Sequence, residues 1–128
     1  MKINKNTKLI GVLLIVLFVI FSITGCNNNN SEKFGKNITE KRVIEVKEIF
    51  SNPEKFINQT FTLEGKIVRE CPSGCWFYLE DNTGTIFVDI NPSGLSIPQR
   101  VGKKVTVEGE LKRKDGRIIF IGKGVEIK

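Results

Sequence analysis

The sequence predicts an all-β domain with one short N-terminal helix, in which five strands close into a small barrel. Three observations support this fold class. From residue 60 onward, apolar residues recur at every second position, as they do in strands. Two turn signals, 81-DNTG-84 and 115-DG-116, divide the strands into hairpins. Gly65 and Gly109 interrupt strands where a small barrel needs sharp bends, and closure leaves no exposed sheet edges.

Residues 1–25 precede the domain and have the composition of a secretory signal. Basic residues are followed by an apolar run, and the run ends in 23-ITGC-26. These last four residues resemble a lipobox, which implies that signal peptidase cuts before Cys26 and that Cys26 carries the lipid. The alternative is an uncleaved anchor, because the run approaches the roughly 20 apolar residues that span a bilayer. Both hypotheses place the rest of the chain on the cell membrane, facing away from the cytoplasm.

Residues 26–37 are predicted to be a flexible tether, because they are polar and show no period. We expect one folded domain over residues 38–128. The formal net charge of +6 falls to +3 once the signal and its three lysines are removed. The remaining excess of positive charge lies in the residues from Arg100 to the end of the chain. It would attract an anionic polymer or an anionic membrane, or simply form a solvated face.

The segment 44-IEVKEIFSNPEKFIN-58 predicts a helix over residues 44–57. Asn52 suits the N-cap of a restarted turn, and Pro53 suits the first helical position, where its missing N–H costs nothing. Apolar residues begin the segment at roughly helical spacing: Ile44, Val46, Ile49 and Phe50.

The strands that follow have predictable faces. In the strand over residues 60–68, one side carries Phe61, Leu63, Gly65 and Ile67, and the other carries Thr60, Thr62, Glu64 and Lys66. In the next hairpin, over residues 76–90, pairing of Leu79 with Ile86 and of Phe77 with Val88 makes a buried face. The opposite face then shows Tyr78 across from Phe87, with Trp76 beside them. In the last hairpin, over residues 104–122, we expect Val105, Val107 and Leu111 to point inward.

From about Thr60 to Val125 the chain resembles the OB-fold of the nucleic-acid-binding, tRNA-anticodon-type family. The matching stretches are LEGKIV, FYLEDNTGTIFVDI and GKKVTVEGELKRKDGRIIF. The preceding VKEIFSNPEKFINQTFTLEG resembles the leading segment of small bacterial or archaeal lipoproteins with such a domain. The resemblance implies a five-stranded Greek-key barrel, and its best-documented ligands are single-stranded nucleic acids. Descent and shape do not by themselves assign an activity.

OB-folds bind chains across the outer face of their second and third strands. Trp76, Tyr78 and Phe87 are predicted on that face, where bases stack on aromatic rings for about 1–3 kcal/mol each. At the tip of the last hairpin, phosphates of nucleic acid or of another anionic oligomer would meet basic side chains. These are Lys112, Arg113, Lys114 and Arg117. The alternatives are aromatics that only stabilise the hairpin as cross-strand pairs and a basic tip that is only solvated.

The stretch 71-CPSGCW-76 holds two cysteines in the loop between the first two barrel strands. With Cys26 acylated, Cys71 and Cys75 form an even pair, and we predict a disulfide, which persists outside the cytoplasm. Zinc fits poorly, because a closed site takes four ligands and the chain has no histidine. Copper(I) accepts two thiolates, and a redox role or free thiols also stay open. A redox motif would more usually be C-x-x-C on a βαβ unit.

No catalytic constellation is visible. Without histidine there is no Ser–His or Cys–His pair. Glu80, Asp81 and Asp89 are interpreted as turn and solvent-face residues. We therefore expect a monomeric binding module that is not an enzyme and has no cofactor and no metal. The alternatives are a protein-interaction module of a membrane complex, or a metal or redox carrier using Cys71 and Cys75.

Overall fold

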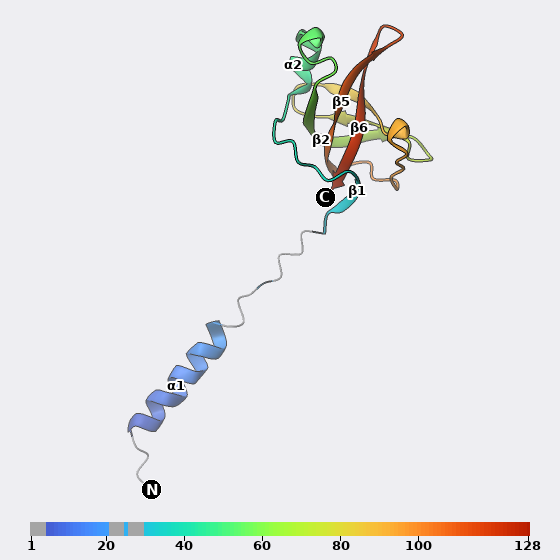
Figure 1. The fold of residues 1–128 in the computed structure, drawn as a ribbon. Helices are drawn as coiled ribbons and strands as arrows, with labels where there is room; N and C mark the ends of the chain where they lie inside the picture. Colours follow the sequence, from blue (N-terminus) through green and yellow to red (C-terminus); the bar gives the residue numbers. More distant parts are fainter. Residues whose placement is uncertain (1–4, 21–24, 26–29) are drawn as a thin grey trace.

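The computed structural model describes residues 5–20, 25 and 30–128 (Figure 1). Cys26, the predicted lipid site, lies outside the described residues. No helix in the described ranges combines the length and apolarity needed to cross a membrane. The N-terminal elements are α1 (Lys5–Ile20), β1 (Glu32–Gly35), α2 (Val46–Ser51) and the 3₁₀ turn η2 (Pro53–Lys55). The remainder are β2 (Thr60–Glu70), β3 (Trp76–Glu80), β4 (Thr85–Asp89), the 3₁₀ turn η3 (Asn91–Ser93), β5 (Lys104–Lys114) and β6 (Arg117–Ile127).

Strands β2 to β6 close into a five-stranded barrel. Strand β2 pairs with β3 on one side and with β5 on the other, and β3 pairs with β4. Strand β6 completes the ring by pairing antiparallel with β5 and parallel with β4. This Greek-key order is that of the OB-fold, so the predicted fold class is confirmed.

The hairpins have the predicted registers. Leu79 lies opposite Ile86, and Tyr78 lies opposite Phe87. The β5–β6 turn has two residues, Asp115 and Gly116, at φ angles of 51° and 74°. Positive φ at both positions is the requirement of the tight turn that Asp-Gly favours.

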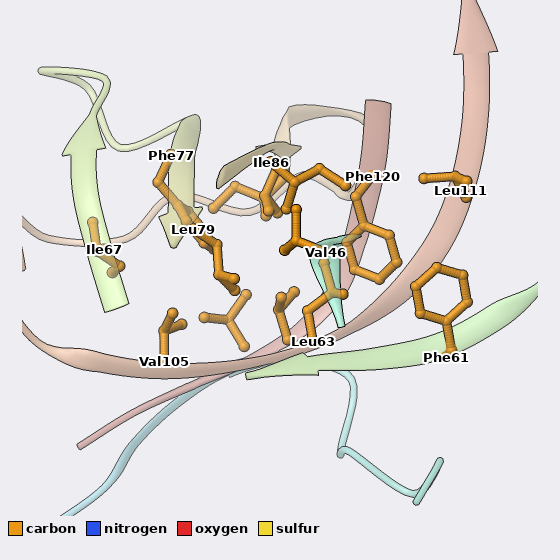
Figure 2. Packing of buried hydrophobic residues seen from close by; sticks show 14 of the residues in the cluster. Val46, Phe61, Leu63, Ile67, Phe77, Leu79, Ile86, Val105, Leu111 and Phe120 are labelled. Carbon is orange, nitrogen blue, oxygen red and sulfur yellow. The ribbon is translucent and has the colours of Figure 1, made fainter. Parts of the chain in front are cut away.

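The barrel interior is filled by one apolar core (Figure 2). Phe61 and Phe120 pack with ring centroids 5.1 Å apart. Val46 of α2 adds a buried side chain from outside the barrel strands. The predicted inward residues of the strands are all buried: Phe61, Leu63, Ile67, Phe77, Leu79, Ile86, Val88, Val105, Val107 and Leu111. Burial of this apolar surface supplies the main driving force for folding.

Two glycines allow the barrel to bend, as predicted. A Cβ atom on Gly65 would lie 2.3 Å from the carbonyl oxygen of Glu80, and one on Gly109 would lie 2.1 Å from that of Ile121. Neither backbone approach is compatible with a side chain. Beyond Gly65, β2 turns from pairing with β5 to pairing with β3.

The predicted helix over residues 44–57 is wrong in its extent. It is two short pieces, α2 and η2, separated by Asn52, whose backbone is not helical (φ −149°, ψ 74°) and whose side chain forms no cap. Pro53 does begin the second piece. The first piece is capped from elsewhere, because Asp81 Oδ2 accepts a hydrogen bond of 2.9 Å from the backbone N–H of Val46.

The predicted tether over residues 26–37 also needs correction, because Glu32–Gly35 form β1 and pair with β6. The segment after β1 is bound by Glu108, which is 2% exposed. Its Oε2 accepts hydrogen bonds from the backbone N–H groups of Thr39 (2.7 Å) and Glu40 (3.0 Å). The same segment covers Thr62, which lies on the polar side of the predicted strand and donates its hydroxyl to the Glu40 carbonyl at 2.7 Å.

Candidate ligand-binding face

Three aromatic side chains on adjacent strands form one cluster. The ring centroids of Trp76 and Tyr78 are 5.8 Å apart, those of Trp76 and Phe87 are 5.6 Å apart, and those of Tyr78 and Phe87 are 5.3 Å apart. Each ring is partly exposed, whereas their strand neighbours Phe77 and Val88 are fully buried. The three predicted residues therefore come together on the outside of the barrel, and they are called the aromatic cluster below.

Arg69 of β2 extends this cluster. It lies opposite Tyr78, and its guanidinium carbon lies 5.9 Å from the Tyr78 ring centroid and 6.0 Å from that of Trp76. Both distances fall within the range of cation–π attraction. Sequence analysis missed Arg69, because simple alternation from Ile67 would point it inward. The irregularity in register between Ile67 and Arg69 turns it outward.

Strand β6 adds two partly exposed isoleucines, Ile119 and Ile121, on either side of the buried Phe120. Ile121 lies beside Asp89, and Asp89 lies opposite Trp76, so all three side chains are on the outside of the sheet. The run 118-IIFI-121 was the available sequence signal. Successive residues of a strand point to opposite faces, so four consecutive apolar residues cannot all face the core. The outer face is defined here as Arg69, Trp76, Tyr78, Phe87, Ile119 and Ile121.

The four basic residues predicted for the β5–β6 tip differ in their surroundings. Lys112 Nζ donates to Glu110 Oε1 at 2.8 Å, and Arg113 forms an ion pair with Glu54 of η2. Lys114 and Arg117 are exposed, and neither forms an ion pair with the part of the chain that the structure describes. Of the four predicted basic residues, these two are the ones without an ion pair in the described part of the chain, and the turn between them also carries the exposed Asp115.

The loop between β2 and β3 brings the Cys71 and Cys75 sulfurs within 2.9 Å, as thiols. The Ser73 hydroxyl lies 3.0 Å from Cys71 Sγ and donates to Cys75 Sγ at 3.6 Å. Hydrogen bonds from Cys75 and Ser73 lower the pKa of Cys71 to about 6. The hydrogen bond that Cys75 donates to Cys71 raises the pKa of Cys75. The predicted disulfide between Cys71 and Cys75 stays a prediction. The structure places the two sulfur atoms next to each other, as such a bond requires.

The acidic residues of the β3–β4 hairpin have structural partners. Asp81 Oδ1 accepts hydrogen bonds from the backbone N–H groups of Thr83 (2.7 Å) and Gly84 (3.0 Å), and Asp89 Oδ1 accepts one from Asn91 (3.1 Å). Burial favours the neutral form of Asp81, but hydrogen bonds from the Thr83 hydroxyl and from the backbone N–H groups of Val46, Thr83 and Gly84 outweigh burial and lower its pKa. Within the described residues, no three cysteine or carboxylate side chains are grouped to hold a metal ion.

A groove of about 480 Å³ lies elsewhere, along β2, β5 and the β3–β4 turn. None of its lining residues belongs to the outer face. Its charged lining is mixed, since Lys66, Lys104 and Lys128 alternate with Glu64, Glu80 and Asp81. It therefore offers no surface of one sign to a charged ligand.

Among solved structures, the chain is similar to the hypothetical protein ygiW of E. coli. The TM-score is 0.51 at 20% identity, over 74% of this chain and 97% of that one. It is also similar to the S. pombe Stn1–Ten1 complex, with a TM-score of 0.45 at 14% identity over 66% and 74% of the two chains. The first likeness supports the fold alone, and the second carries no argument. No family model matches the chain, and no curated protein matches it.

Proposed function

We propose that this protein is a binding module, without catalytic activity, whose outer face takes a single-stranded nucleic acid or another anionic oligomer with flat rings. The observation that supports this most directly is the aromatic cluster with the Arg69 guanidinium against it. It lies on the strands that correspond to the second and third strands of an OB-fold, which is where this architecture binds oligonucleotides.

The chemistry of the outer face suits such a ligand. A flat ring that stacks on Trp76, Tyr78 or Phe87 gains roughly 1–3 kcal/mol. The rings already contact one another at 5.3–5.8 Å between centroids, so little side-chain freedom is lost on binding. Arg69 supplies a guanidinium, whose planar fork matches phosphate oxygens.

The basic tip supplies a second, weaker contact. Lys114 and Arg117 are exposed on the hairpin that joins β5 and β6, which borders the binding surface in OB-folds. Contacts of this kind with phosphate are non-specific and weaken with added salt. They position an oligomer without selecting its sequence.

The proposal is tested with the full-length chain in detergent micelles and a fluorescently labelled single-stranded oligonucleotide, followed by anisotropy. Tyr78→Ala and Phe87→Ala should each weaken binding by about 5- to 100-fold, the equivalent of one lost stacking contact. Phe50→Ala is the matched control, because Phe50 is an aromatic residue of α2 that is 51% exposed and outside the outer face. An equal loss in the control, or no binding by the parent chain, would contradict the proposal and favour a protein partner.

We further propose that the chain is a membrane lipoprotein, anchored through Cys26 and facing away from the cytoplasm. The support is the sequence: a basic start, an apolar run and the lipobox-like 23-ITGC-26. Cells that express the full chain with radiolabelled palmitate should label it in the membrane fraction. Cys26→Ser should abolish the label, and a label that survives this substitution would contradict the anchor.

A further inference from the structure

The loop that carries Cys71 and Cys75 is held by hydrogen bonds that need no bond between the sulfurs. The Cys71 N–H donates to the Trp76 carbonyl at 3.0 Å, and the Ile97 N–H donates to the Gly74 carbonyl at 3.0 Å. Gly74 has φ +74°, and a Cβ there would lie 1.9 Å from the Ile97 carbonyl oxygen. Gln99 Nε2 also donates to the Cys71 carbonyl at 2.9 Å. A cross-link would close only a five-residue loop and would add little entropic stabilisation.

The two sulfur atoms are not equivalent. Cys75 is partly exposed, whereas Cys71 is buried, with 8% of its surface exposed. The Cys71 sulfur accepts a hydrogen bond from the Cys75 thiol and lies 3.0 Å from the Ser73 hydroxyl. A thiolate at Cys71 can accept the single Ser73 proton in place of Cys75, so both neighbours stabilise it. The pKa of Cys71 is accordingly lowered and that of Cys75 is raised. In thiol–disulfide exchange, the accessible sulfur is attacked and the sulfur of lower pKa is the better leaving group.

We propose that Cys71 and Cys75 form a reversible dithiol–disulfide site that exchanges with low-molecular-weight thiols and disulfides at the Cys75 sulfur. This site is a property of the β2–β3 loop and does not depend on the ligand of the outer face.

Oxidation takes two steps. The Cys75 thiolate attacks one sulfur of a small disulfide, forming a mixed disulfide on Cys75 while the other half leaves as a thiolate. The Cys71 thiolate then attacks Cys75 Sγ, forming the Cys71–Cys75 bond and releasing the second thiolate. The protein gives up two electrons and two protons, and the small disulfide becomes two thiols. Reduction reverses both steps, with Cys71 as the leaving group.

The test uses the full-length chain with Cys26→Ser, in detergent micelles, equilibrated in buffers of reduced and oxidised glutathione. Samples are quenched in acid, alkylated and weighed by mass spectrometry. The fraction of Cys71–Cys75 disulfide should change from nearly none to nearly all across these buffers. It should depend on the squared concentration of reduced glutathione divided by the concentration of oxidised glutathione. A disulfide that persists in every buffer would identify a structural staple, and thiols that never oxidise would identify an inert pair. Either result overturns the proposal.

Single substitutions test the inequality of the sulfurs. Cys71→Ser should accumulate a glutathione adduct on Cys75, because no second thiol displaces it. Cys75→Ser should form its adduct at least about tenfold more slowly, because Cys71 is buried. Ser73→Ala removes the hydroxyl that can donate to a Cys71 thiolate, and it should slow reduction of the disulfide by glutathione. Equal adduct rates at the two cysteines would overturn the assignment of Cys75 as the exchanging sulfur.

Discussion

The guanidinium carbon of Arg69 lies 6.0 Å from the ring centroid of Trp76, across the β2–β3 pair. This arrangement places a positive charge beside the largest partly exposed ring of the domain. An anionic ligand with flat rings would meet both the ring and the charge on one face.

Replacing Arg69 should weaken binding of a single-stranded oligonucleotide and reduce its salt dependence. Arg69→Ala removes a phosphate contact and a cation–π contact, and we expect a loss of about 5- to 30-fold. The slope of log affinity against log salt should become shallower by about 0.7, the value for one phosphate contact on a single strand. Arg69→Lys should retain most of the slope and lose part of the affinity.

Lys47→Ala is the control for Arg69, because it makes the same charge change on α2, where the exposed side chain is away from the outer face. Anisotropy titrations at several salt concentrations give both quantities. If Lys47→Ala and Arg69→Ala have the same effect, net charge rather than the Arg69 position governs binding.

The basic tip should contribute through Lys114 and Arg117 more than through Lys112 and Arg113. The last two are already paired with Glu110 and Glu54, whose carboxylates reduce the potential that a phosphate would meet. We expect the double alanine variant at 114 and 117 to weaken oligonucleotide binding at low salt and to match the parent chain at high salt. The double variant at 112 and 113 should have the smaller effect at low salt. The opposite ranking would contradict an electrostatic role for the two exposed residues.

Asp81 should be a structural residue that joins the β3–β4 turn to α2. Its carboxylate accepts backbone hydrogen bonds from Val46, Thr83 and Gly84. Asp81→Ala should therefore lower the free energy of unfolding by about 2 kcal/mol, the sum of a lost helix cap and turn contacts. Asp89→Ala should cost less, since Asp89 Oδ1 accepts a single backbone hydrogen bond. Urea unfolding of both variants gives the comparison, and equal costs would contradict the capping role.

Glu108 should make the domain more stable at neutral pH than in acid. Burial alone would raise its pKa, but hydrogen bonds from Glu40, Thr39 and Lys36 outweigh burial and lower it. A folded-state pKa below the unfolded value of about 4.3 gives stability that is fully present above that pH. This stability is lost as the pH falls through the folded-state pKa. Glu108→Gln should thus destabilise the domain at pH 7 and flatten the decline of stability in acid.

Glu64→Gln is the control for Glu108, because the Glu64 side chain lies on the same side of the same strand pair but is exposed. Thermal unfolding between pH 3 and pH 7, read as the difference between each variant and the parent chain, isolates each carboxylate. If the stability of Glu108→Gln declines as steeply in acid as that of the parent chain, protonation of Glu108 is not a cause of the decline.

The parts of the fold that sequence analysis predicted depend on interactions between close neighbours in the chain. The Asp115-Gly116 turn sets the β5–β6 register, and the spacing between Tyr78 and Phe87 sets their pairing. The close backbone approaches at Gly65 and Gly109 were visible as glycines within alternating strands. For the candidate site, the same alternation was sufficient to bring three aromatic rings to one face.

The parts that it missed depend on distant partners or on one local irregularity. Glu108 binds the backbone of Thr39, 69 positions away, so a polar segment without periodicity becomes ordered. Strand β1 forms in the same way, through pairing with the end of β6. Arg69 reaches the aromatic cluster because one irregularity in β2 changes the side of the sheet that it faces. Single-sequence periodicity contains no information about such partners.

The most direct measurement of the central claim follows the fluorescence of Trp76, the single tryptophan of the chain, during titration with a single-stranded oligonucleotide. The full-length chain in detergent micelles is titrated at low and at high salt. Stacking on the outer face predicts saturable quenching whose midpoint moves to higher oligonucleotide concentration as salt is added. Fluorescence that stays constant at both salt concentrations, while the domain remains folded, would contradict binding of nucleic acid at this face.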